Sequence, residues 1–339
     1  MNTKPIVVLI KKIPLLYLIL IVCSCNSGDK KNSSITELPP IETQMTKTLT
    51  ATLEHKIKAT LGEGAFWNYE TKELYWIDIE GKTLHIYNPN TKTNKNISTP
   101  SRVGTVVPVN KEKAVIALQD GIYIINTDSG DHELISEIER NIPTNRFNDG
   151  KCDPSGRLWV GSMALDETPK AANLYMVNAK GESILKKDGV TISNGIVWTK
   201  DKKTMYYIDT PTAEVKAYDY DDATGNITNE RVAIKVSNDL GYPDGMAIDG
   251  NDNLWIGMWN GNAVIQFDPK SGTIMSKIEV PAHNVTSCAF GGENLDILYI
   301  TTASVDMTDE EHKKFPLAGS LFKVNPGVIG VKSPFFKFE

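Results

Sequence analysis

Leu158-Trp159-Val160-Gly161 is a short apolar stretch whose pattern occurs six times along the chain and decides its fold. The second residues of the six stretches are Tyr75, Val115, Trp159, Tyr206, Trp255 and Tyr299. Successive second residues are 40, 44, 47, 49 and 44 positions apart, which matches the roughly 40 to 50 residues of one four-stranded propeller blade. The repeat therefore predicts an all-β fold, a six-bladed β-propeller.

Turn-forming clusters separate the strands within the repeats. Examples are Asn88-Pro89-Asn90-Thr91, Asp153-Pro154-Ser155-Gly156 and Asp268-Pro269-Lys270-Ser271-Gly272. Such clusters between alternating apolar runs are typical of chains built from short strands. No long stretch has helical periodicity. A body of about 290 residues is long enough for one propeller core and does not require a second domain.

A second feature repeats ahead of the apolar stretches. A glycine stands 9 to 11 residues before the second residue of five of them, and the residues before these glycines are Glu63, Val103, Asp149, Asn194 and Asp244. The innermost strand of each blade lines the central channel, so one repeat position in several blades forms a ring around the axis. We therefore expect Glu63, Asn194 and Asp244 to face one another there.

Two interpretations of this ring compete. Asn-Gly and Asp-Gly are common turn dipeptides, so a turn explains any one site alone. A turn explains neither the shared offset nor Glu63, and converging carboxylates would repel one another unless a cation neutralised them. Glu63, Asn194 and Asp244 supply oxygen only, which suits a hard cation such as Ca²⁺, Mg²⁺ or Mn²⁺, with Zn²⁺ an open alternative. The five histidines show no paired metal-ligand spacing.

Six motifs follow one another between about residues 55 and 330. They are Leu61-Gly62-Glu63-Gly64-Ala65-Phe66-Trp67, Arg146-Phe147-Asn148-Asp149-Gly150-Lys151, Gly156-Arg157-Leu158-Trp159-Val160-Gly161-Ser162-Met163, Ile192-Ser193-Asn194-Gly195, Pro243-Asp244-Gly245-Met246 and Ser287-Cys288-Ala289-Phe290-Gly291-Gly292. In this order and spacing they resemble the gluconolactonase, regucalcin (senescence marker protein) and luciferin-regenerating-enzyme family. The resemblance implies a six-bladed propeller that hydrolyses sugar-type lactones with one divalent metal cation, Ca²⁺ being favoured.

The resemblance also implies roles for individual residues. Glu63, Asn194 and Asp244 match the family's metal ligands, and Asp244 also matches its catalytic acid/base. Arg146 and Asn148 match its substrate-binding pair, with Asn148 able to reach the metal directly or through water. The plainer alternatives are that Arg146 pairs with a nearby acid and that Asn148 starts a turn.

Asp166 lies where members of this family often carry a glutamate that contacts the substrate. The resemblance therefore implies substrate binding by Asp166. An aspartate is one methylene shorter than a glutamate, so the following Glu167 is the alternative.

The proposed chemistry follows from the ligand set. A cation at the mouth of the channel would polarise a lactone carbonyl, lower the pKa of a bound water and stabilise the oxyanion that forms. Asp244 would then take a proton from that water. Two alternatives remain, because a fold does not establish a reaction. One is a non-enzymatic calcium- or ligand-binding propeller, and the other is a hydrolase of another ester.

Residues 1–25 have the composition of an export signal. Lys11 and Lys12 lead into the apolar run 13–22, which is too short for a permanent membrane span. The sequence Val22-Cys23-Ser24-Cys25 resembles a bacterial lipoprotein processing site and predicts lipidation of Cys25. Processing at Cys23, or an ordinary cleaved signal peptide, is the alternative. The predicted location is the periplasm or cell envelope, with membrane anchoring.

The remaining composition sets the predicted domains and partners. Residues 26–50 are rich in Ser, Thr, Lys, Asn and Pro and predict a flexible tether, which leaves residues 51–339 for the propeller. Cys152 and Cys288 fall in different repeats, so no disulfide is predicted. A net charge of -6 leaves no basic stripe for nucleic acid. The expected partner is a small-molecule lactone, with membrane contact only through the lipid anchor.

Overall fold

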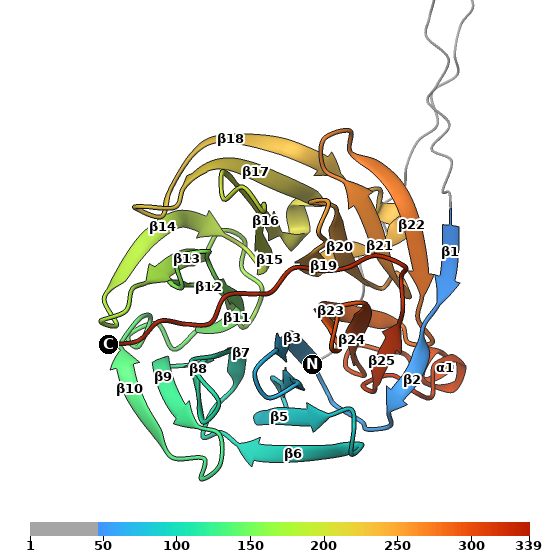
Figure 1. Ribbon diagram of the computed structural model, residues 1–339, viewed down its shortest axis with the longest axis horizontal. Coiled ribbons are helices and arrows are strands. Elements are labelled where there is room, and N and C mark those ends of the chain that lie inside the picture. Colours follow the sequence, from blue (N-terminus) through green and yellow to red (C-terminus); the bar gives the residue numbers. More distant parts are fainter. Residues whose placement is uncertain (1–46) are drawn as a thin grey trace, which may run out of the picture. The chain divides into compact units, whose positions relative to one another are not determined.

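The computed structural model describes residues 47–339, which form a ring of six β-sheets around a central channel (Figure 1). The all-β, six-bladed propeller predicted from the repeat is confirmed. Besides strands, the described residues contain one short α-helix, α1 (Asp309–Lys314), and two 3₁₀ turns, η1 (Thr210–Thr212) and η2 (Asn238–Leu240). No helix in this part of the chain is long and apolar enough to cross a bilayer.

The first three blades follow one another along the chain, each an antiparallel sheet of four strands. Blade 1 contains β3 (Gly62–Asn68), β4 (Glu73–Asp78), β5 (Thr83–Asn88) and β6 (Thr93–Ser98). Blade 2 contains β7 (Val103–Pro108), β8 (Lys113–Leu118), β9 (Gly121–Asn126) and β10 (His132–Ser136). Blade 3 contains β11 (Asn145–Cys152), β12 (Leu158–Ala164), β13 (Ala172–Val177) and β14 (Ser183–Val190).

Blades 5 and 6 each take one strand from the amino-terminal end of the described chain. Blade 4 contains β15 (Ser193–Trp198), β16 (Thr204–Asp209), β17 (Glu214–Asp221) and β18 (Asn226–Lys235). Blade 5 contains β19 (Tyr242–Ile248), β20 (Leu254–Trp259), β21 (Ala263–Asp268), β22 (Thr273–Glu279) and β1 (Lys47–Thr50). Blade 6 contains β23 (Asn284–Gly291), β24 (Ile297–Ala303), β25 (Leu321–Val324) and β2 (Thr52–His55).

The two ends of the described chain close the ring. Strand β2 pairs antiparallel with β25, so blade 6 is completed by a strand from the other end of the propeller sequence. Strand β1 pairs in parallel with β22 and adds a fifth strand to blade 5. Residues 47–50, assigned to the tether from composition, therefore form part of a blade. Their short polar sequence carries no repeat signal, and only the pairing with β22 reveals the strand. Cys23, Cys25 and the rest of the tether lie outside the described residues.

Turn aspartates connect the innermost strand of a blade to the aromatic strand that follows. Asp153 accepts hydrogen bonds from the backbone N–H groups of Ser155 and Arg157 and, through Oδ2, from the Trp159 indole at 3.0 Å. Asp249 repeats the arrangement in blade 5, where its Oδ2 accepts from the Trp255 indole at 3.0 Å. The aspartate satisfies buried donors of both the turn and the strand, which explains why turn clusters and aromatic stretches recur together.

The carboxyl-terminal segment 325–339 crosses the ring at the carboxyl ends of the inner strands. Its backbone donates from Gly330 to Leu295, from Phe336 to Pro108 and from Lys337 to Gly156. Figure 1 shows this dark red segment running across the ring. It therefore covers one end of the propeller and leaves the amino ends of the inner strands as the open end.

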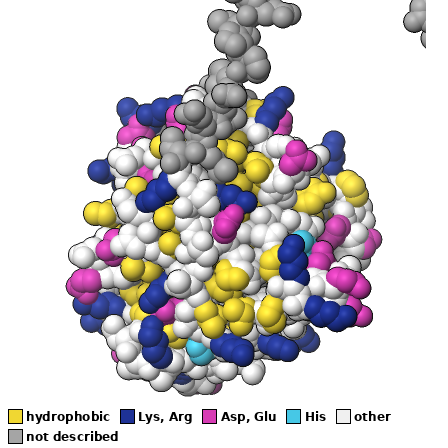
Figure 2. Space-filling model, turned by 90° about the vertical axis from the view of Figure 1, so that its right-hand side faces the viewer, with side chains coloured by type: hydrophobic (Ala, Val, Ile, Leu, Met, Phe, Trp, Pro, Cys, Tyr) yellow, Lys and Arg dark blue, Asp and Glu magenta, His cyan; other side chains and the backbone are white. Residues whose placement is uncertain are grey.

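The outer surface of the propeller carries both signs of charge. On the face drawn in Figure 2, Lys and Arg side chains are interspersed with Asp and Glu. Inside the body, Cys152 and Cys288 are buried free thiols.

Candidate active site

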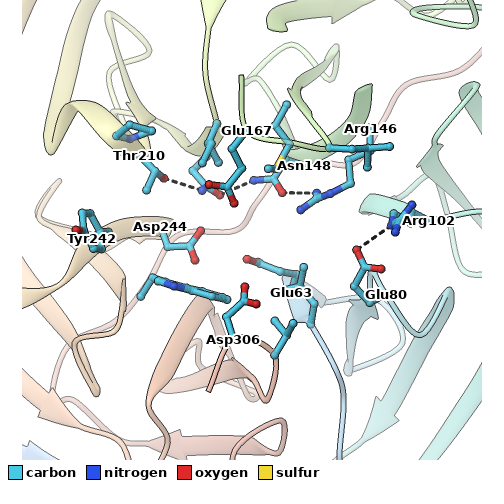
Figure 3. Close-up of a pocket in the computed structure, with 18 of the residues that line it drawn as sticks. Glu63, Glu80, Arg102, Arg146, Asn148, Glu167, Thr210, Tyr242, Asp244 and Asp306 are labelled. Atoms are coloured by element: carbon cyan, nitrogen blue, oxygen red, sulfur yellow. Dashed lines mark hydrogen bonds and ion pairs between the residues drawn. The ribbon is translucent and has the colours of Figure 1, made fainter. Parts of the chain in front are cut away.

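A cavity of about 570 Å³ opens at the amino ends of the inner strands, within the size range of ligand pockets. Five of the six residues predicted for the site line it: Glu63 from β3, Arg146 and Asn148 from β11, Asn194 from β15 and Asp244 from β19. Figure 3 shows the Glu63 and Asp244 carboxylates directed toward the same central space. The structure thus brings together residues from four blades.

A β-bulge in the inner strand holds each of the predicted metal ligands. The register of β3 with β4 shifts between Glu63 and Phe66, and β15 and β19 shift at Asn194 and just after Pro243 in the same way. A bulge inserts an extra residue and re-aims a side chain, often beside an active site. The oxygen–glycine dipeptides therefore lie within inner strands, and the hairpin-turn interpretation of these dipeptides is wrong.

At two positions in these bulges, the local geometry requires glycine for steric reasons. Gly64 has φ +60, a left-handed conformation that favours glycine, and its N–H donates to Glu63 Oε2 at 3.0 Å. A Cβ at Gly195 would lie 2.9 Å from the Asp244 carbonyl oxygen. Glycine there permits the close approach of β15 and β19 that brings Asn194 near Asp244.

Burial and mutual repulsion disfavour the ionised forms of the Glu63 and Asp244 carboxyl groups in the absence of a cation. Burial, followed by the negative charge of Asp149, raises the pKa of Glu63 to about 8. Burial, followed by the charge of Glu63, raises the pKa of Asp244 well above its usual range. Among the described residues, Asp244 Oδ1 has no hydrogen-bond partner. A buried oxygen without a partner is costly unless a ligand satisfies it.

Asp149 is a third buried carboxyl group at the channel. It occupies the same repeat position as the predicted ligands, and its Oδ2 also has no hydrogen-bond partner in the described chain. Burial raises its pKa, while the charge of Lys151 acts in the opposite direction. The Lys151 ammonium donates to the Met246 carbonyl oxygen. Asp149 therefore adds negative charge next to Glu63 and Asp244, and a cation would relieve the repulsion among all three.

The oxygen donors present fit a hard divalent cation. Glu63 and Asp244 offer carboxylate oxygens, and Asn194 offers an amide oxygen to the same cavity. In the described part of the chain, no cluster of three or more His, Cys, Asp or Glu side chains has metal-binding geometry. The candidate set differs from such a cluster because its third member is an asparagine.

A chain of hydrogen bonds fixes the two asparagine amides that line the cavity. Arg146 Nη1 donates to Asn148 Oδ1 at 2.5 Å, and Asn148 Nδ2 donates to Asn194 Oδ1 at 3.1 Å. Asn194 Nδ2 then donates to Thr210 Oγ1 at 2.8 Å, and Thr210 donates to the Pro243 carbonyl oxygen at 2.8 Å. The chain joins blades 3, 4 and 5 and leaves Asn194 Oδ1 as the atom available to a cation. Thr210 was not predicted, because it lies in the connection after β16.

Arg146 is buried yet keeps its charge at neutral pH. Burial lowers its pKa to about 10, while the nearby charges of Glu80 and Glu63 favour the protonated form. Within residues 47–339, Arg146 donates to Asn148 Oδ1 and to the Phe147 carbonyl oxygen and forms no direct pair with a carboxylate. Asn148 lies within β11 and does not begin a turn. These positions favour the substrate-pair interpretation over the plainer alternatives.

The structure places Glu167, not Asp166, in the wall of the cavity (Figure 3). The Asp166 side chain is exposed and accepts hydrogen bonds from the backbone and hydroxyl of Thr168 at 3.1 and 2.8 Å. Asp166 therefore closes a local turn outside the cavity, and a substrate contact by Asp166 stays a prediction. Glu167, left open as an alternative, has the position from which a substrate can be reached.

Several cavity residues were not predicted: Glu80, Arg102 and Asp306 lie in connections, and Tyr242 and Trp259 stand at the ends of β19 and β20. Glu80 and Arg102 form an ion pair, with Arg102 Nε 2.8 Å from Glu80 Oε1. Tyr242 and Trp259 contribute aromatic surface, and Asp306 adds a further carboxylate. None of the five stands at the repeat position of Glu63, Asn194 and Asp244, so the repeat gave no signal that they line the same cavity.

The sequence model of the SMP-30/Gluconolactonase/LRE-like region matches residues 61–304. A Bacillus subtilis (strain 168) protein, provisionally named a sugar lactone lactonase, YvrE, is 40% identical over 272 residues, covering 80% of this chain and 93% of that protein.

Two solved structures are similar over most of their length. A luciferin-regenerating enzyme has a TM-score of 0.80 and 34% identity, covering 85% of this chain and 100% of that chain. A calcium-binding protein, regucalcin, from Agrobacterium tumefaciens str. C58 has a TM-score of 0.80 and 27% identity, covering 86% and 97%. The chain belongs to the SMP-30/Gluconolactonase/LRE-like family, and this membership supports a role in lactone hydrolysis.

Proposed function

We propose that this protein is a hydrolase that opens sugar-type lactones with the help of one divalent cation. The observation that carries the proposal is that Glu63, Asn194 and Asp244 line one substrate-sized cavity, where the buried Asp244 Oδ1 has no hydrogen-bond partner among the described residues. The adjacent Arg146–Asn148 pair supplies donors for a polyhydroxylated substrate. The name of the similar Bacillus protein supports the same substrate class.

The cation would be held by Glu63 and Asp244 carboxylates and by Asn194 Oδ1. When bound there it would supply Lewis acidity toward the lactone carbonyl and lower the pKa of water at the site. Ca²⁺ is our first choice because the donors are all oxygen and because a similar protein is described as calcium-binding. Mg²⁺, Mn²⁺ and Zn²⁺ are the cations to compare with it.

Residues of the chain itself would provide proton transfer and substrate binding. Asp244 has one oxygen, Oδ1, free of hydrogen bonds from the described residues, and this oxygen takes the proton of the attacking water. Arg146 keeps a fixed positive charge beside the ring of carboxylates and binds hydroxyl or carbonyl oxygens of the substrate. Glu167, in the cavity wall, accepts hydrogen bonds from sugar hydroxyl groups.

Export and lipid anchoring are part of the proposal, supported by sequence alone. The signal at residues 1–25 and the Cys23-Ser24-Cys25 motif assign the protein to the bacterial periplasm or cell envelope, with lipid on Cys25. Metabolic labelling with a fatty acid tests this assignment. Label that is lost in Cys25→Ala and kept in Cys23→Ala would support Cys25, whereas an unlabelled wild-type protein would contradict anchoring.

The second candidate function is calcium or ligand binding without catalysis. It is favoured by the same three oxygen donors and by the naming of a similar protein as calcium-binding. The purified full chain, stripped of metal and then supplied with each cation in turn, separates the two when lactones and other esters are offered as substrates. Cation-restored hydrolysis that Asp244→Asn abolishes supports the enzyme. Tight cation binding without turnover supports the binding protein.

A further inference from the structure

The Glu80–Arg102 ion pair occupies one wall of the cavity and belongs to neither the proposed metal set nor the Arg146–Asn148 pair. Glu80 lies just after β4 in blade 1, and Arg102 lies just before β7 in blade 2. Arg102 Nε and Glu80 Oε1 are 2.8 Å apart, and each side chain is 30% exposed. Figure 3 shows the pair facing the cavity beside Glu63 and Arg146. Both charges can therefore meet a bound substrate.

The backbone that presents Glu80 is tightly held. Asp78 accepts hydrogen bonds from the N–H groups of Thr60, Leu61 and Gly81 at 2.9 Å each. These bonds fix the turn after β4 from both sides of Glu80. A carboxylate on a rigid turn keeps its distance from a substrate, which is a condition for electrostatic discrimination.

The Glu80 carboxylate stabilises the positive charge of two guanidinium groups, those of Arg102 and Arg146. Glu80 raises the pKa of Arg102 through their hydrogen bond. Glu80 is also the nearby charge that most favours the protonated form of Arg146, whereas Arg102 disfavours it. Among the described residues, Arg102 donates a hydrogen bond only through Nε, to Glu80 Oε1. Its two terminal amino groups therefore have no acceptor in this part of the chain. Neutralising Glu80 would leave two arginines able to receive a substrate anion.

The net charge of the cavity also disfavours the binding of an anionic substrate. Its lining contains two arginines and five acidic side chains, namely Glu63, Glu80, Glu167, Asp244 and Asp306. A divalent cation at the proposed site would still leave one excess negative charge. This excess would disfavour a substrate with an added carboxylate or phosphate.

We propose that the Glu80–Arg102 pair is a specificity filter that admits neutral polyhydroxylated lactones and excludes lactones bearing a carboxylate or phosphate. The proposal rests on the proposed lactonase function for its kinetic test and on the cavity alone for its binding test. Arg102 provides hydrogen-bond donors to substrate hydroxyls, while Glu80 cancels the positive charge that would otherwise attract an anion.

The kinetic test compares D-glucono-1,4-lactone with D-glucaro-1,4-lactone, which differ only in a hydroxymethyl or a carboxylate at C6. We expect the wild-type protein to prefer the neutral lactone and Glu80→Gln to reduce the ratio of the two kcat/KM values by about tenfold or more. The amide keeps an acceptor for Arg102 Nε, so the fold is preserved. An unchanged ratio in Glu80→Gln overturns the filter.

Two variants separate the ion pair from simpler explanations. Asp306→Asn removes one negative charge from the same cavity without releasing an arginine, and it should change the ratio several-fold less than Glu80→Gln does. A change as large as that in Glu80→Gln would assign the preference to total charge and overturn the role of the pair. Glu293→Gln alters an exposed ion pair with Lys72 outside the cavity and controls for the substitution itself.

The binding test does not need catalysis. Calorimetry with Ca²⁺ present compares methyl β-D-glucopyranoside with methyl β-D-glucopyranosiduronate, which have no lactone bond. Glu80→Gln should bind the glucuronide about tenfold more tightly than the wild-type protein does, with a smaller change for the glucoside. No gain for the glucuronide, including no binding at all, overturns the filter. A gain without lactone hydrolysis by either protein keeps the filter and refutes only the lactonase function.

Discussion

The carboxylate of Glu63, on β3 of blade 1, is the charge that contributes most to the raised pKa of Asp244, on β19 of blade 5. Both side chains are directed into the same central space (Figure 3). The two residues are distant in sequence but close in the folded protein, where repulsion between their carboxylates lowers the free energy of unfolding. This repulsion makes the stability of the metal-free protein depend on pH.

The metal-free protein should lose stability as the pH rises. Burial raises the pKa of Glu63 from 4.5 to about 8, so the folded state binds more protons than the unfolded chain between these values. Stability is therefore highest below pH 4.5 with respect to this group and falls as the pH rises toward about 8. We expect the Tm of metal-stripped protein to drop by about 5 °C across this window. Differential scanning calorimetry with saturating Ca²⁺ should show a much smaller drop; an equal drop would contradict a cation at this site.

Asp244→Asn should separate stability from catalysis. The substitution removes a buried carboxyl group that is costly to ionise in the folded state, so the metal-free protein should be at least as stable as the wild type at pH 8. Loss of the proton acceptor should lower kcat by about 100-fold or more. Thermal unfolding and lactone hydrolysis measured on one preparation check both effects. A variant that keeps wild-type turnover would exclude Asp244 as the base.

Arg146→Lys should weaken substrate use more than cation binding. Lysine retains the charge but lacks the planar guanidinium group whose Nη1 donates to both Asn148 Oδ1 and the Phe147 carbonyl oxygen. We expect kcat/KM to fall by about 10- to 100-fold, with Ca²⁺ affinity changing by less than about fivefold. Calorimetric titration of Ca²⁺ and steady-state kinetics give the two numbers. A comparable loss of Ca²⁺ affinity would instead assign Arg146 to the metal site.

Glu167→Gln should raise KM more than Asp166→Asn does. Glu167 lines the cavity, whereas Asp166 is exposed and bonded to Thr168. Loss of a charged acceptor for a sugar hydroxyl should raise KM by about tenfold, while the change at Asp166 should stay within about twofold. Parallel kinetics on the two isosteric amide variants are the measurement. The opposite order would return the substrate contact to Asp166.

Removal of β1 should destabilise the propeller. A chain beginning at residue 51 lacks Lys47–Thr50, which pair with Ser276–Glu279 on β22. We expect its Tm to be lower by about 2 to 4 °C than that of a chain beginning at residue 47. Scanning calorimetry of the two truncated proteins checks the effect. Equal Tm values would show that β1 contributes nothing to the stability of blade 5.

The repeat predicted the fold well because its signal is redundant. Aromatic stretches such as Leu158–Gly161 recur at blade spacing, and turn aspartates such as Asp153 and Asp249 bind the following tryptophans in the same way. The repeat also placed Glu63, Asn194 and Asp244 on inner strands. It gave no indication that a β-bulge, instead of a hairpin turn, directs them inward, because both conformations use the same dipeptides.

Residues outside the repeat could not be placed in this way. Glu80, Arg102 and Asp306 lie in connections whose conformations depend on neighbouring blades. The choice between Asp166 and Glu167 depended on which side chain the loop turns toward the cavity. Strand β1 lacked any apolar pattern and became visible only through its pairing with β22.

The sequence by itself determined the number of blades, the all-β class and the positions that line the axis, because these follow from periodicity and local turn chemistry. Only the tertiary structure decided which side chains share a cavity, which carboxyl groups raise one another's pKa and which loop charges form a pair. Those relations depend on distances between blades, and distances arise only when the ring closes. The Glu80–Arg102 pair, formed between two blades, is therefore a product of the closed ring and not of any one repeat.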